Sequence, residues 1–73
     1  MDTLGRRIEE MRRRRVMTQA ELAIAAKVSL MTIGRLEADK IDSPRPNTVR
    51  GIAAALGVSP TWLVTGEENG LPS

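Results

Sequence analysis

The stretch from Thr18 to Glu37, TQAELAIAAKVSLMTIGRLE, constrains the fold of this chain more than any other segment. Thr18 is followed three residues later by Glu21, and this pair is typical of a capping box at the first turn of a helix. Ser29 is a residue type that begins helices, because its hydroxyl oxygen accepts a hydrogen bond from a free backbone N–H. The segment between these two starts is rich in small alanines. The stretch therefore predicts two short helices that are joined by a tight turn and approach each other closely.

A further helix is predicted on the N-terminal side. Leu4, Ile8 and Met11 recur at helical spacing, which places them on one core-facing stripe. Thr3 is the predicted N-cap. We expect this helix to run from about Leu4 to Arg14.

Two more helices are predicted after the loop at residues 39–45. The first starts at Pro46, whose missing N–H is harmless at a helix start, and ends at Gly57. Its core-facing stripe consists of Val49, Ile52, Ala53 and Leu56. The second starts at Ser59-Pro60 and ends at Gly66, with Trp62 and Leu63 turned inward. Five short helices without strand signals predict an all-α, five-helix orthogonal bundle over residues 1–66, followed by a flexible C-terminal tail or linker stub at residues 67–73.

Composition excludes most catalytic and metal sites. The 73 residues include no cysteine and no histidine, so disulfides, the usual zinc ligands, a histidine base and a thiolate nucleophile are all excluded. We expect no enzyme activity, no cofactor and no metal. All 11 basic residues and seven of the nine acidic residues lie in residues 1–50, a net charge of +4, whereas residues 51–73 carry −2. This polarity favours a polyanionic partner on one face, and ordinary solvated charge is the alternative.

The hydropathy pattern favours a soluble, cytoplasmic protein. No apolar run reaches the roughly 18 residues that a membrane span needs. Asp2, Arg6 and Arg7 interrupt any signal-peptide core at the N-terminus.

The chain resembles the DNA-binding domain of lambda-type phage repressors, the Cro/repressor helix-turn-helix family also called XRE. The resemblance covers Gly5 to Gly66, and it is carried by four motifs: RIEEM at 7–11, TQAELA at 18–23, IGRLE at 33–37 and AALGVSPTWLVTG at 54–66. It implies a sequence-specific transcriptional regulator, a repressor that binds a palindromic double-stranded DNA operator as a homodimer. The second helix of the unit would then lie in the major groove.

The resemblance implies four base-reading positions, Ser29, Leu30, Met31 and Arg35. An arginine can donate two hydrogen bonds to guanine, and the apolar side chains of Leu30 and Met31 suit thymine methyl groups. For Met31, a place in the protein core is the alternative. Gly34 is costly inside a helix, and both close approach to the DNA backbone and local packing would explain it.

The resemblance also implies contacts to phosphate or the minor groove by Arg12, Thr18, Gln19, Thr32, Lys40 and Arg45. For Gln19, bracing a side chain of the recognition helix is a further expected role. For Thr18, capping the helix would by itself explain why this residue is a threonine. Arg12 is expected first to form a structural ion pair with Glu37. Arg13, Arg14 and Arg15 either attract DNA at long range or form a solvated face.

Dimer contacts are implied at Pro46, Val58 and Pro60. The chain also departs from the family pattern in the turn, where many relatives have a glycine and this chain has Lys27, and after Glu37, where it has Ala38 and Asp39. Lys27 would either bear a steric penalty or change the turn. Ala38 and Asp39 replace the polar residue and glycine of relatives, so the phosphate contact of the loop after Glu37 cannot be carried over from them. A protein-interaction module such as an antitoxin is the alternative function, because the same fold serves both roles.

Overall fold

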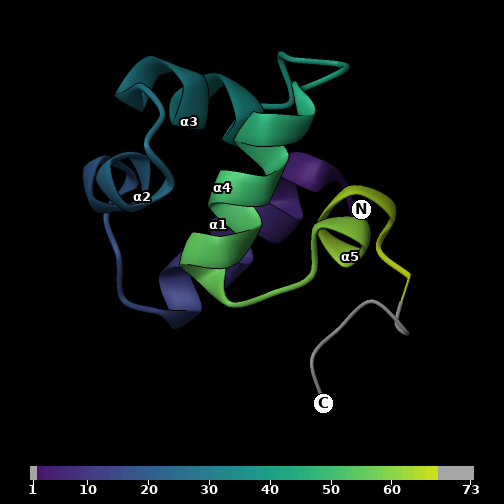
Figure 1. Cartoon of the computed structure of the whole chain (residues 1–73), viewed down its shortest axis with the longest axis horizontal. Coiled ribbons are helices and arrows are strands. Elements are labelled where there is room, and N and C mark those ends of the chain that lie inside the picture. Colours follow the sequence, from purple (N-terminus) through teal and green to yellow (C-terminus); the bar gives the residue numbers. More distant parts are fainter. Residues whose placement is uncertain (1, 68–73) are drawn as a thin grey trace.

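The computed structural model describes residues 2–67, and this part of the chain is a bundle of five helices without strands (Figure 1). The helices are α1 (Leu4–Arg14), α2 (Gln19–Ala26), α3 (Leu30–Glu37), α4 (Pro46–Leu56) and α5 (Pro60–Thr65). In Figure 1, α4 passes through the middle of the molecule, with α2 and α3 on one side, α5 on the other and α1 behind. The prediction of an all-α five-helix bundle is confirmed. Residues 68–73 of the predicted tail lie outside the described residues.

Four of the five helices in this part of the chain begin where hydroxyl side chains cap them, whereas α4 begins at Pro46 without a side-chain cap. Thr3 Oγ1 accepts a hydrogen bond from Arg6 N at 3.1 Å, and Ser59 Oγ accepts one from Trp62 N at 2.9 Å. The capping box of α2 is complete, because Thr18 Oγ1 accepts from Glu21 N at 3.0 Å while Glu21 Oε1 accepts from Thr18 N at 2.8 Å. Each cap satisfies a backbone N–H that the helix itself leaves free.

Left-handed residues end several of the helices. Gly57 and Gly66 have φ of +72° and +74° and end α4 and α5, as the sequence predicts. Lys27 takes the same conformation at the end of α2, with φ +61° and ψ +42°. The turn therefore keeps the left-handed geometry in spite of its lysine, with the steric penalty of a Cβ there.

One apolar core joins all five helices. Its most deeply buried large side chains are Ile8, Leu22, Ile33, Leu36, Ile52, Leu56 and Leu63. Helix α2 packs very closely on α4, because an added Cβ at Gly51 would lie only 2.6 Å from the carbonyl oxygen of Ala26. This close packing holds the end of α2, the first helix of the two-helix unit formed by α2 and α3, against α4.

A buried arginine attaches α1 to α5, and sequence reasoning did not find it. Arg7 Nε donates to Leu63 O at 2.8 Å and Nη2 donates to Val64 O at 2.7 Å. Its Nη1 also forms an ion pair with Asp2 at 3.1 Å. The signal was present in the spacing, because Arg7 falls on the same helical stripe as Leu4 and Ile8.

Candidate nucleic-acid interface

The turn between α2 and α3 orients the second helix. Lys27 N donates to Ile24 O at 3.2 Å and Val28 N donates to Ala23 O at 3.0 Å, which closes the end of α2. Ser29 then begins α3 in an extended conformation. Val28 packs against the core between them, so the direction of α3 is set by packing as well as by the turn.

The outer face of α3 carries the residues expected to read bases. Leu30 and Met31 are 53% and 63% exposed, and Arg35 is exposed as well. The alternative that Met31 belongs to the core is therefore wrong. Within residues 2–67, no ion pair or side-chain hydrogen bond engages Arg35. Its five N–H donors remain available to a partner.

Ser29 and Thr32 are bonded to each other at the start of α3. Thr32 N donates to Ser29 Oγ at 3.0 Å, and the two hydroxyl oxygens lie 2.8 Å apart. Ser29 is exposed and Thr32 is half-buried. The expected base contact of Ser29 therefore falls on a hydroxyl that also caps α3, and the expected phosphate contact of Thr32 falls on a hydroxyl bonded to it.

The expected structural ion pair is present beneath the outer face. Arg12 Nε and Nη2 donate to the two carboxylate oxygens of Glu37 at 2.6 and 3.0 Å, and the two side chains are only 11% and 6% exposed. Gln19 Nε2 donates to Glu37 Oε1 at 3.0 Å. Arg12 Nη1 donates to Met17 O at 2.8 Å. Glu37 thus fixes the end of α3 to α1 and to the start of α2.

This network engages Arg12 in the structural role that was expected first, ahead of a phosphate contact. Its hydrogen bonds to Glu37 raise the pKa of Arg12, against the opposing effect of burial. Because three of its nitrogen atoms are bonded and the side chain is buried, we do not retain the phosphate contact expected for Arg12. Gln19 uses one amide N–H on Glu37 and keeps a second for another acceptor.

The remaining expected phosphate contacts are exposed. Thr18 lies exposed at the start of α2, and its hydroxyl is engaged in the capping box. Lys40 and Arg45 are exposed in the loop between α3 and α4. Figure 1 places this loop along the same edge of the molecule as α3, whereas the C-terminal end of α1 lies at the opposite edge.

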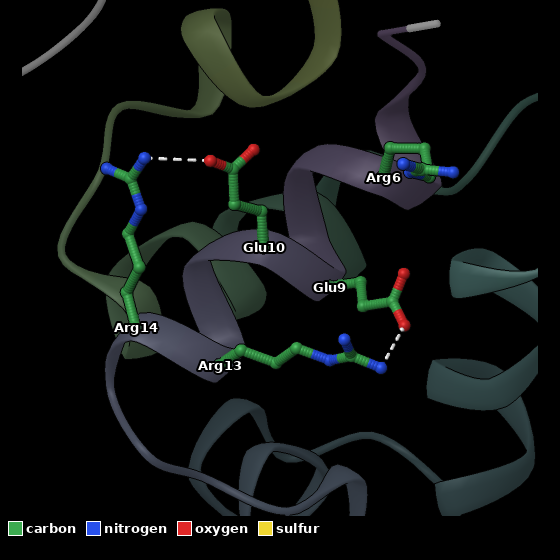
Figure 2. A pocket seen from close by; sticks show the side chains of 5 residues that line it. All are labelled: Arg6, Glu9, Glu10, Arg13 and Arg14. Carbon is green, nitrogen blue, oxygen red and sulfur yellow. Dashed lines mark hydrogen bonds and ion pairs between the residues drawn. The ribbon is translucent and has the colours of Figure 1, made fainter.

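The arginine run of α1 is partly neutralised by its own helix. Figure 2 shows Arg13 paired with Glu9 and Arg14 paired with Glu10, at 2.9 and 2.7 Å. Both pairs join residues four apart on an exposed helix face, an arrangement that contributes little to stability. For these arginines the structure favours a solvated face over a surface that attracts DNA.

Asp39 replaces a family glycine after α3, and its role was not expected from the sequence. It has a left-handed φ of +57°. Its carboxylate accepts hydrogen bonds from Thr3 Oγ1 at 2.8 Å and from Gly5 N at 3.1 Å. The carboxylate therefore lies at the N-terminus of α1, where helix N–H groups and the helix dipole favour negative charge. It attaches the loop that follows α3 to α1.

One of the three expected dimer residues must be corrected. Val58 is only 8% exposed and packs in the core, because the turn after α4 carries it inward. Pro46 and Pro60 are exposed, and they line a shallow pocket together with Val64. Val64 is 48% exposed, so it replaces Val58 as the apolar side chain available at this surface.

Residues 2–67 contain neither a helix that could span a membrane nor an acidic cluster that could hold a metal ion.

Comparison with known proteins agrees with this geometry. The family described as "Helix-turn-helix domain" matches residues 3–63. The HTH-type transcriptional regulator PrtR of Pseudomonas aeruginosa is 46% identical over 66 residues, which cover 90% of this chain and 25% of that protein. The immunity repressor protein of Bacillus phage phi105 is 36% identical over 66 residues, covering 90% of this chain and 44% of that protein. The chain thus spans less than half the length of either relative.

A solved structure shares the whole arrangement of helices. The P22 c2 repressor, in a crystal structure with synthetic operator 9T in the presence of Tl+, superposes with a TM-score of 0.85 at 27% identity. The match covers 92% of this chain and all of that one. From the capped α2–α3 unit and these matches, we conclude that the chain belongs to the helix-turn-helix domain family.

Proposed function

We propose that this domain is a sequence-specific DNA-binding transcriptional regulator, a repressor that binds a palindromic operator as a dimer through α3 in the major groove. The P22 c2 repressor matched above was solved with a synthetic operator, which supports DNA as the partner here. The names of the two relatives support a regulatory role. The role places the domain in the cytoplasm with the DNA, and it requires binding alone, without catalysis, cofactor or metal.

The observation that carries the proposal is the contrast between the two faces of α3. The inner face is fixed, because Ile33 is fully buried and Glu37 is bonded to α1 and α2. The outer face presents Arg35 with no ion pair among residues 2–67. A rigid helix with an unpaired guanidinium suits a partner that supplies acceptors in a fixed geometry.

The proposal assigns a role to each exposed residue. Arg35 donates two hydrogen bonds to O6 and N7 of a guanine, and Leu30 and Met31 contact thymine methyl groups. Ser29 contributes its hydroxyl at the helix start. Phosphate contacts come from Thr18, Gln19, Thr32, Lys40 and Arg45, and they orient the domain without reading sequence.

A dimer would present two copies of α3 to successive major grooves. The half-sites would then be about 34 Å apart, one turn of the double helix. We assign the contact between subunits to the apolar surface of Pro46, Pro60 and Val64, which lies at the start of α4 and on α5.

The test is in vitro selection from a random duplex library, followed by affinity measurements. We expect a symmetric site whose half-sites repeat at about one helical turn. Arg35→Ala should reduce the preference for the selected site over random DNA by about 10-fold or more, since a good bidentate contact contributes roughly 1–3 kcal/mol. Arg14→Ala removes the same charge from the solvated face of α1 and should keep the preference. Equal preference in both variants would exclude Arg35 as the base reader.

A second candidate is a protein-interaction module such as an antitoxin. The observation that favours it is the exposure of three apolar side chains on the two-helix unit, Ile24 of α2 and Leu30 and Met31 of α3. A mobility shift with random genomic fragments separates the regulator from a module that does not bind DNA. Such a module predicts no saturable protein–DNA species, whereas the regulator predicts one that competitor operator DNA removes. A search for a tight protein partner is needed as well, because an antitoxin can also bind DNA.

A further inference from the structure

Gly34 has no structural reason to be a glycine. It lies in the interior of α3, where glycine is among the least favourable residues for helix stability. Apart from its two chain neighbours and the backbone of its own helix, a Cβ added at this position would meet no atom of residues 2–67 within 4 Å. Its backbone is helical, so no left-handed conformation requires it either. The folded domain would accept an alanine here, and the reason for the glycine must lie outside the domain.

The position of Gly34 indicates what that reason is. Residues three and four apart are neighbours on a helix surface, so Leu30 and Met31 lie one turn before Gly34 on the exposed face. Arg35 follows it directly. Gly34 is therefore a gap in the side-chain surface of α3, with two exposed apolar residues on its N-terminal side and the free guanidinium on the other.

We infer that Gly34 is a specificity-determining residue whose gap receives the C5 methyl group of a thymine, beside the guanine that Arg35 contacts. This inference rests on the function proposed above. Among the groups on base edges in the major groove, the thymine methyl is the apolar one. The apolar borders formed by Leu30 and Met31 match a methyl group. They do not match a phosphate, which would need N–H or O–H donors at the same place.

The experiment combines a protein change with a base change. Gly34→Ala is compared with the wild type on the selected operator and on versions in which each thymine is replaced by uracil, which lacks only the methyl group. At one thymine in each half-site, the wild type should lose about fivefold in affinity on replacement, the loss expected for one buried methyl group. Gly34→Ala should bind the intact operator about 10-fold more weakly and should not respond to uracil at that position.

A stability measurement keeps the result interpretable. Gly34→Ala should raise the Tm by about 4–8 °C, because alanine favours the helix and the space is open. Ala54→Gly, on the exposed surface of α4, makes the opposite change away from α3; it should lower the Tm and leave operator affinity unchanged.

The outcomes separate this inference from the proposed function. If Gly34→Ala binds with wild-type affinity and keeps the same uracil response, the gap does not receive a methyl group, although the domain still binds its operator. If Gly34→Ala lowers the Tm, the glycine serves folding and the inference is wrong. If selection returns no operator, both the inference and the proposed function fail.

Discussion

At the scale of single residues, three non-glycine positions in residues 2–67 adopt left-handed backbone conformations: Val16, Lys27 and Asp39. Asp39 gains hydrogen bonds to Thr3 and Gly5 that offset its strain. Lys27 closes the turn that orients α3. Val16 has no comparable gain, because its side chain is 89% exposed. For a β-branched residue such a conformation is an outlier.

We therefore expect Val16→Gly to stabilise the domain. The left-handed conformation costs a residue with a Cβ roughly 1–2 kcal/mol, and glycine avoids this cost. Part of the gain is offset, because glycine loses more chain entropy on folding than valine does. The free energy of unfolding should rise by about 0.5–1 kcal/mol in urea titrations. Val16→Ala retains a Cβ and is the control, with a smaller gain. Equal or lower stability of Val16→Gly would show that no strain is stored at this position.

At the scale of elements, local signals decide where the helices lie and distant polar contacts decide how they are attached. Thr3, Thr18, Ser29 and Ser59 begin four helices through bonds to residues three positions away. The attachment of α3 depends instead on Glu37, whose partners Arg12 and Gln19 are 25 and 18 residues distant.

The Glu37 network predicts a large effect on stability. Glu37→Gln keeps the shape of the side chain and removes its charge, which leaves the buried guanidinium of Arg12 without a counter-charge. Removing one partner of a buried pair costs about 3 kcal/mol or more in free energy of unfolding. Glu10→Gln breaks the exposed pair with Arg14 and should cost less than about 1 kcal/mol. Similar losses in the two variants, measured by urea unfolding, would contradict a structural role for Glu37.

At the scale of the whole molecule, pairing redistributes the effective positive charge. Arg7, Arg12, Arg13 and Arg14 all have acidic partners. Seven basic residues have no ion pair among residues 2–67: Arg6, Arg15, Lys27, Arg35, Lys40, Arg45 and Arg50. Three of these, Arg35, Lys40 and Arg45, belong to α3 and the loop beside it. The cations of α3 and this loop are thus free to meet a polyanion, whereas four of the basic residues elsewhere are held in ion pairs.

This distribution predicts a specific salt dependence. Operator affinity should fall steeply with salt, with a log–log slope of about −0.9 for each phosphate contact. Arg45→Ala should make this slope shallower by about one unit and weaken binding on all sequences alike. Arg13→Ala should leave the slope unchanged, since Arg13 is paired with Glu9 on the opposite side. Titration of both variants between about 50 and 200 mM salt decides the point. Equal slope changes would mean that the whole basic surface acts together.

Local sequence patterns were sufficient to predict the helices and the family of this domain. Capping residues, prolines, terminal glycines and apolar stripes act within one or two turns, so their effects can be predicted without the rest of the chain. The motifs of the α2–α3 unit likewise indicated which face of α3 carries Leu30, Met31 and Arg35. Their exposure agrees with this expectation, and their contacts with bases remain predictions.

The packing of the helices against one another selects which polar residues are used inside the molecule and which apolar residues remain outside. Arg7 bonds to α5 across 56 residues, Asp39 caps α1 across 34, and Val58 turns into the core. Helical spacing places Arg7 on the core-facing stripe, but no local pattern encodes its partners or the other two outcomes, because each depends on which distant groups packing brings together. Packing also determines the surroundings of Gly34: the space beside it is open because no other helix of residues 2–67 covers that side of α3.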